Sequence, residues 1–215
     1  MGYAYAIFNG EKNTFEDWGL MLSNVSIPLP SAQIITVPIP GGGLLDLSEV
    51  LTGRVNFNAR TVTLTFDAMN SYDEWPELIA KISNYLHGKS KTLIFDNDVS
   101  FYYSGRFAVD TSKSDEATTT VVITGMVDPY KYDVEPSEIL LSVVTSASFL
   151  VYGSRMPVVP IVTVSAIMTV TFGGVVYSLV VGANTIPGVC LVEGENTLLF
   201  TGTGNITISY RGGSF

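Results

Sequence analysis

The sequence predicts a mainly β protein in two domains, the first α+β and the second almost entirely strand. Only one segment, 71–87, has a strong helical pattern. After residue 136, Val, Ile, Thr and Tyr dominate, and Gly or Pro turns recur about every 8 to 12 residues. The 215 residues are 47% hydrophobic and only 14% charged, which favours stacked sheets or surfaces that are buried only in an assembly.

Charge divides the chain into the same two parts. Residues 1–136 hold 9 of the 11 basic and 17 of the 20 acidic residues. That leaves 2 and 3 for residues 137–215, so the net charges are −8 and −1. Two prolines and several charges in the segment 128–136 disfavour a continuing strand or helix. We therefore expect one domain over residues 1–130 and a β-sandwich over residues 131–215.

The first domain is predicted to begin with extended segments. Prolines interrupt short apolar stretches between Asn24 and Ile39, as they do in edge strands or extended arms. The flexible turn Gly41–Gly43 follows. Apolar residues alternate with threonines over 55–66, so this segment is expected to form a half-buried strand. Together with the helix and hairpin below, these strands predict an N-terminal β-sandwich.

The one predicted helix lies between Ser71 and His87, with its apolar residues on one face. Asp73 is the expected N-cap, because it places Pro76 among the first N–H groups, which have no partner in the helix. Gly88 supplies the left-handed residue that ends a helix.

Strands follow the helix to the end of the chain. A hairpin is expected around the turn Asp96–Asp98, and two further strands, 107–109 and 118–126, are expected to pair across a polar loop. Turns are predicted throughout the second domain, including one at Gly202–Gly204. No internal repeat is apparent.

The sequence offers little for catalysis. With one His (His87) and one Cys (Cys190), the chain can form neither an internal disulfide nor a zinc site of several Cys and His. Acidic pairs such as Glu16–Asp17 are candidates for acid–base chemistry, but no nucleophile or base is recognisable near them. The net charge of −9 disfavours binding to nucleic acid or to anionic lipid. We therefore expect a scaffold or binding module with no catalytic residues, cofactor or metal, and no membrane partner.

Several short motifs, in this order and spacing, resemble the distal tail protein (Dit) family of bacteriophages with long non-contractile, siphovirus-type tails. No single motif is specific, but together they cover roughly the first 130 residues. The motifs are Phe8–Gly10, Asp17–Leu20, Val37–Glu49, Asn58–Arg60, Leu86–Lys89, Phe95–Asp98, Tyr102–Arg106 and Asp128–Lys131. The segments Glu193–Thr197 and Ile206–Arg211 are similar to the β-sandwich that follows in such proteins, which is galectin-like in outline.

This resemblance implies a structural role at the tip of a virion tail. Such proteins form a ring, typically hexameric, that joins the tail tube to a tail-fibre or lysin hub. The implied partners are copies of the chain, the tail tube protein, the tape-measure protein and a tail hub or receptor-binding protein, assembled in the host cytoplasm of a phage or prophage. The acidic first domain suits a channel that repels DNA, which would be met only in transit.

A ring requires each copy to offer two different contact surfaces. The apolar, proline-rich stretch and the turn after it supply the candidates for this subunit interface, which are Pro38, Pro40, Gly41, Gly42, Gly43, Leu44 and Asp46. An alternative function is a carbohydrate- or receptor-binding β-sandwich, which would need an aromatic platform among polar groups. Its aromatic residues Tyr152, Tyr177, Phe200 and Tyr210 are scattered, and we expect most of them in the core.

Overall fold

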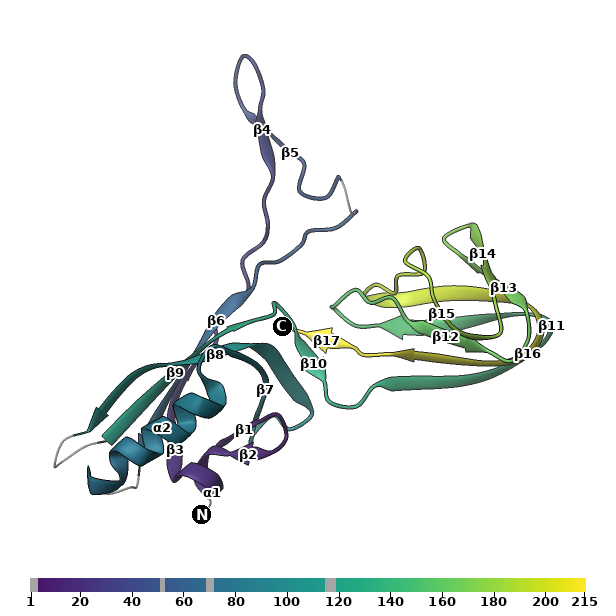
Figure 1. Cartoon of the computed structure of the whole chain (residues 1–215). Helices are drawn as coiled ribbons and strands as arrows, with labels where there is room; N and C mark the ends of the chain where they lie inside the picture. The colour runs from purple at the N-terminus through teal and green to yellow at the C-terminus, as the bar shows by residue number, and fades with distance from the viewer. Residues whose placement is uncertain (1–3, 51–52, 69–71, 115–118) are drawn as a thin grey trace. The chain divides into compact units, whose positions relative to one another are not determined.

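The chain forms two compact units in a computed structural model (Figure 1). Unit 1 comprises residues 1–131 together with Phe215, and unit 2 comprises residues 132–214. Strands predominate in both, so the prediction of a mainly β protein is confirmed. No helix among the described residues is long and apolar enough to cross a membrane. The structure describes residues 4–50, 53–68, 72–114 and 119–215.

Unit 1 is built on one antiparallel sheet in the strand order β2-β1-β7-β8-β9-β6-β3. Its strands are β1 (Ala6–Phe8), β2 (Lys12–Asn13), β3 (Leu20–Ser26), β6 (Arg60–Ala68), β7 (Lys89–Phe95), β8 (Phe101–Ser114) and β9 (Thr119–Val127). The N–H of Leu22 in β3 donates to the carbonyl of Ala4, just before β1, at 2.9 Å. This bond links β3, at one end of the strand order, to the segment before β1, near the other end, so the sheet curls around its own core.

The core of unit 1 follows the predicted alternation. Along β6, the side chains of Val62, Leu64 and Phe66 are buried, whereas the threonines between them face outward. Helix α2 (Trp75–Leu86) buries its apolar face in the same core and contacts β7 and β8. The rings of Phe8 and Phe107 meet edge to face there, with centroids 5.2 Å apart. The predicted strand face and the predicted helix are therefore both confirmed.

The N-terminal end of α2 differs from the prediction, whereas its C-terminal end agrees with it. A 3-10 turn (Tyr72–Glu74) precedes α2, and Glu74 is the N-cap residue without a side-chain bond, so the expected cap at Asp73 is wrong. Pro76 still lies in the first turn, where no helical N–H bond is lost. The helix ends at Leu86, and Gly88 has the expected positive φ of 72°.

A second, short helix was not predicted. Helix α1 (Thr14–Trp18) starts at Asn13, whose side chain accepts hydrogen bonds from the N–H groups of Phe15 and Glu16. Gly19 ends it in the left-handed conformation. A single turn is too short for an apolar pattern to reveal, but an Asn followed three residues later by Glu is an N-cap signature.

Strand β8 is one continuous strand of 14 residues where two separate strands were predicted. Gly105 does not end it, because this glycine lies where β8 passes closely over β9. A Cβ at this position would lie 2.2 Å from the carbonyl oxygen of Met126. The predicted polar loop, residues 112–116, is wrong over residues 112–114, which pair with β9 as part of β8; its other two residues lie outside the described residues.

Unit 2 is a sandwich built around one long ribbon. Strands β11 and β16 pair along all 17 residues of each. Strand β13 pairs with the first half of β16 and β12 with the second half, so these strands all belong to one hydrogen-bonded sheet in the order β14-β13-β16-β12-β15, with β11 also paired to β16. The strands of this sheet are β11 (Ser137–Gly153), β12 (Ile161–Val164), β13 (Met168–Phe172), β14 (Val175–Leu179), β15 (Gly182–Thr185) and β16 (Gly194–Tyr210). Two short strands outside it, β10 (Lys131–Asp133) and β17 (Gly213–Ser214), pair with each other.

The middle of the ribbon has an unusual backbone. Thr145 has φ of 80°, rare for a β-branched residue, and it lies opposite Gly202. A Cβ on Gly202 would lie 2.6 Å from the Cβ of Met168. The turn predicted at Gly202–Gly204 is therefore wrong, because these glycines lie inside β16 and let another segment pack against it.

Two segments of unit 2 share a sequence and a hydrogen-bond pattern that the sequence analysis missed. Residues 180–185 and 192–197 both read Val-x-Gly-x-Asn-Thr. In the second, Asn196 Oδ1 accepts from the N–H of Val192 at 3.0 Å, and its Nδ2 donates to the carbonyls of Val192, Gly194 and Val151. Asn184 makes the corresponding bonds in the first. Each Asn thus closes the loop that leads into its strand.

Candidate assembly site

A long arm leaves unit 1 between β3 and β6 (Figure 1). We define the arm as residues 27–59. Near its outer end, β4 (Thr36–Pro38) and β5 (Leu44–Asp46) pair as an antiparallel hairpin. An isolated bridge between Ala32 and Phe57 joins the two legs closer to the sheet.

Local sequence explains why this segment extends. Pro28 and Pro30 remove backbone donors from the outgoing leg, which disfavours pairing within the main sheet. Backbone bonds between the legs replace that pairing, including one from the N–H of Gln33 to the carbonyl of Asn56 at 2.8 Å. At the tip, Gly41–Gly43 all have φ between 97° and 121°, a conformation in which other residues are strained.

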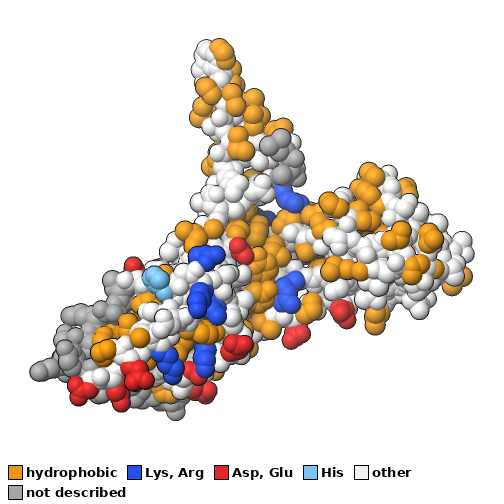
Figure 2. Space-filling model, viewed as in Figure 1, with side chains coloured by type: hydrophobic (Ala, Val, Ile, Leu, Met, Phe, Trp, Pro, Cys, Tyr) orange, Lys and Arg blue, Asp and Glu red, His pale blue; other side chains and the backbone are white. Residues whose placement is uncertain are grey.

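The arm is apolar and exposed. Every residue from Ser31 to Asp46 is exposed, and none from Ser31 to Leu45 is charged. Figure 2 shows hydrophobic side chains along it. Patches of this kind mark protein interaction sites. The large apolar residues, 45% to 76% exposed, are Leu29, Ile34, Ile35, Val37, Ile39, Leu44, Leu45 and Val50.

The structure brings the seven predicted interface residues together at the outer end of the arm. Pro38 ends β4, Pro40 and the three glycines form the tip, and Leu44 and Asp46 lie in β5. Their contact with another subunit remains a prediction. The apolar residues of the outgoing leg, such as Ile34 and Ile35, were not among the predicted interface residues. Their signal was a run of apolar residues between prolines without the alternation of a half-buried strand.

Asp46 differs from the other candidates because its carboxylate is engaged within the arm. The hydroxyl and the N–H of Ser48 both donate to Asp46 Oδ1, and these bonds lower the pKa of Asp46. The Ser48 hydroxyl oxygen also accepts from the N–H of Ile35 at 2.9 Å. Asp46 and Ser48 therefore fasten the returning leg to the outgoing leg, which holds the apolar residues in a defined arrangement.

A buried arginine lies at the root of the arm. Arg60 is 4% exposed, and its Nη1 donates to the carbonyl of Pro28 at 3.3 Å. Its guanidinium lies 5.4 Å from the centre of the Tyr103 ring. Its Nε and Nη2 are buried without a hydrogen-bond partner, and burial lowers the pKa of the group. Arg60 thus ties the outgoing leg to the first residue of β6.

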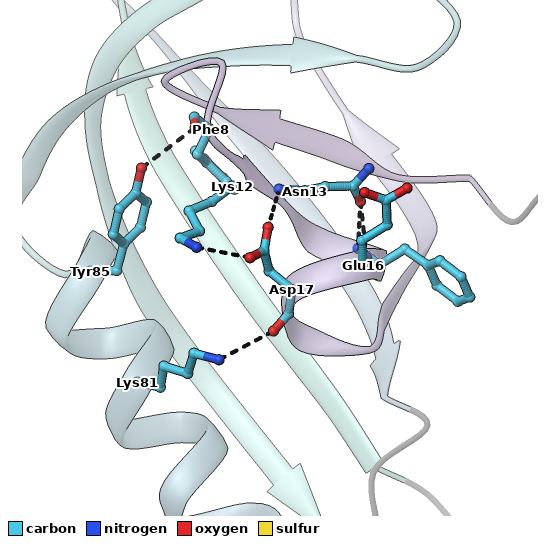
Figure 3. A network of polar contacts seen from close by, with 8 residues as sticks. Phe8, Lys12, Asn13, Glu16, Asp17, Lys81 and Tyr85 are labelled. Atoms are coloured by element: carbon cyan, nitrogen blue, oxygen red, sulfur yellow. Dashed lines mark hydrogen bonds and ion pairs between the residues drawn. The ribbon is translucent and has the colours of Figure 1, made fainter.

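A groove of about 420 Å³ lies between α1 and α2, and acidic residues line it. Among them are Glu16 and Asp17, the pair considered above for acid–base chemistry. Asp17 accepts from Lys12 Nζ at 2.8 Å and from the N–H of Asn13 at 2.9 Å, and the Lys12 bond is the main reason that the pKa of Asp17 is lowered (Figure 3). Lys81 Nζ donates to the carbonyl of Asp17 at 3.3 Å. The carboxylate of Asp17 therefore joins α1 to the strand before it, and its backbone joins α1 to α2. No group of three His, Cys, Asp or Glu side chains in the described part of the chain is arranged to hold a metal.

The aromatic residues of unit 2 mostly belong to its core, as expected. Phe200 is fully buried, and Tyr177 and Tyr210 pack against the same core. Tyr152 is the exposed member of the four, at 63%. These side chains therefore do not form the shared platform that the carbohydrate-binding alternative needs.

Comparison with known proteins identifies a fold. No family model matches the chain, and no curated protein matches its sequence. A solved structure does match it: the crystal structure of the Dit (gp 19.1) protein of phage SPP1, described as a paradigm of the hub adsorption apparatus in phages that infect Gram-positive bacteria. The TM-score is 0.68 at 14% identity, over 98% of this chain and 99% of that chain. The chain has the fold of SPP1 Dit. The resemblance to distal tail proteins is thus confirmed at the level of fold, and over both units.

Proposed function

We propose that this protein is a structural component of a phage tail tip, whose copies form a ring between the tail tube and a tail-fibre or lysin hub. The fold shared with SPP1 Dit carries the proposal, because the match covers nearly the whole of both chains. A shared fold alone does not specify function. The exposed apolar arm is a separate observation, and it favours an assembling protein over a solitary one.

The arm is the proposed contact between neighbouring copies. In a closed ring each copy offers one surface to the copy before it and a different surface to the copy after it. Leu44 is 67% exposed in the protomer. Burying a whole Leu side chain contributes roughly 1.5–3 kcal/mol, so covering the exposed part of Leu44 would contribute about 1–2 kcal/mol at each contact. Eight such residues on one arm supply the apolar surface that a stable ring contact needs.

The two units then have separate roles. Unit 1, which carries the arm and most of the charge, builds the ring, which we expect to be hexameric in a siphovirus-type tail. Unit 2 projects outward as an attachment point for the hub or receptor-binding protein. The tail tube and tape-measure proteins are the partners on the other face. The acidic residues of unit 1 suit a channel through which DNA passes.

The size of the assembled full chain tests this proposal. Leu44→Asp places a charge on the arm at an exposed site, so folding is preserved while the contact is weakened at least about tenfold. Val176→Asp is the matched control, because Val176 is 63% exposed and lies on β14 in unit 2, whereas the arm belongs to unit 1. Light scattering after size exclusion should show a ring for wild type and Val176→Asp, and smaller species for Leu44→Asp. Equal assembly of both variants would contradict the role of the arm.

A further inference from the structure

Strand β11 has an edge with which no described strand pairs. Among the described strands only β16 pairs with it, although β11 has 17 residues. An edge of this length presents a row of backbone donors and acceptors that another strand can pair with. Proteins usually block such edges with Lys, Pro or short strands. Strand β11 contains no Lys, Arg or Pro, and its one charged residue is Glu138.

The hydrogen bonds show which residues face the open edge. Asn205 of β16 bonds through both its N–H and its carbonyl to Ser165, so it faces away from β11. Its partner Ser142 must therefore direct its own backbone groups outward. At the other end, the Tyr152 carbonyl accepts from the Tyr210 hydroxyl, whereas the Val151 carbonyl faces β16. The even-numbered residues of β11 thus face the edge, and their side chains are also the exposed ones.

We propose that this edge pairs with β11 of a second copy, antiparallel and related by a two-fold axis at Thr145. Thr145 is the central residue of β11, so the irregular backbone of each copy falls opposite that of the other. An axis there also places even-numbered residues opposite even-numbered residues. The outward backbone groups of both copies then meet as hydrogen-bonded pairs.

The side chains in this register are complementary. Leu140 of each copy lies opposite Leu150 of the other, and these residues are 76% and 47% exposed in the protomer. Ser142 lies opposite Ser148. The one charge, Glu138, lies opposite the position of Tyr152, far from its own counterpart. Val144 lies opposite Ser146 next to the axis. The two leucine pairs are therefore the apolar contacts of this register, and no like charges are opposed.

This contact is distinct from the proposed ring contact. It is isologous and involves unit 2, whereas ring contacts are heterologous and are assigned to the arm of unit 1. It joins monomers into dimers, and it links rings to one another through a surface that the arm does not use. A failure of one contact therefore leaves the other testable.

Charge pairs at the two leucine positions test the proposed register in the full chain. Leu140→Lys with Leu150→Lys places like charges opposite each other at both ends of the joint ribbon. Leu140→Lys with Leu150→Glu alters the same exposed sites but places opposite charges there. Light scattering should give wild type and the Lys/Glu variant a larger mass than the Lys/Lys variant. Equal masses for all three proteins, or equal loss of mass in both variants, would overturn the proposal.

Discussion

Replacing Asn196 by Ala is expected to destabilise unit 2 by about 2–3 kcal/mol. Asn196 is 3% exposed and makes four side-chain hydrogen bonds to Val192, Gly194 and Val151. A typical hydrogen bond contributes about 0.5–1.5 kcal/mol net. Water can replace part of the loss near Val192, which is 42% exposed, but not at the buried Val151.

This loss should be visible as a shift in melting temperature. For a domain of this size, 1 kcal/mol corresponds to about 4–8 °C, so the transition of unit 2 should fall by about 8–24 °C. Calorimetry and far-UV circular dichroism follow that transition. Both tryptophans of the chain, Trp18 and Trp75, lie in unit 1. Their fluorescence midpoint should remain unchanged, which shows that the effect is local.

Two further variants make the test specific. Asn184→Ala removes the same pattern of bonds at a less buried site, so its effect should have the same sign and be smaller. Thr197→Ala, at the exposed neighbouring position, should change stability by no more than about 0.5 kcal/mol. If Asn196→Ala were as stable as Thr197→Ala, the account of this repeated loop would be refuted.

Three more predictions concern unit 1 and use its tryptophan fluorescence. Gly105→Ala should lower the unfolding midpoint by more than Ser104→Ala, because its Cβ would lie 2.2 Å from the Met126 carbonyl oxygen; overpacking costs about 1–3 kcal/mol. Arg60→Met should raise the midpoint of the isolated protomer, because it removes a buried cation with two unsatisfied donors; a lower midpoint would contradict this. The pKa of Asp17 is lowered in the folded protein, so its carboxylate stabilises the fold at pH values above its unfolded pKa of about 3.9. That contribution is lost as the pH falls through the folded pKa. Asp17→Asn should therefore reduce the stability difference between neutral and acidic pH.

The parts of the fold that follow from sequence are those in which one face of an element is buried. The alternation around Val62, Leu64 and Phe66 and the spacing of Leu78 and Ile82 both reflect a single core, so the strand and the helix could be predicted. Glycine misled the prediction at one turn, because a glycine at a close approach looks like a glycine in a turn. Gly202 lies inside a long strand for that reason.

The candidate site was only partly predictable, because burial in an assembly and burial in a core select the same side chains. Ile34 and Leu44 are 70% and 67% exposed in the protomer, yet in sequence they resemble core residues. The prolines between Asn24 and Ile39 predicted an edge strand or an extended arm, and in the structure most of this segment belongs to the arm. Arg60 could not be recognised as buried, since nothing near it in sequence supplies a partner.

Electron cryomicroscopy of the assembled full chain tests the central claim most directly, namely that the apolar arm joins copies of this protein. The account predicts closed rings in which residues 34–45 of each copy are covered by the next copy. Rings whose arms extend into solvent, with subunits joined elsewhere, would contradict it.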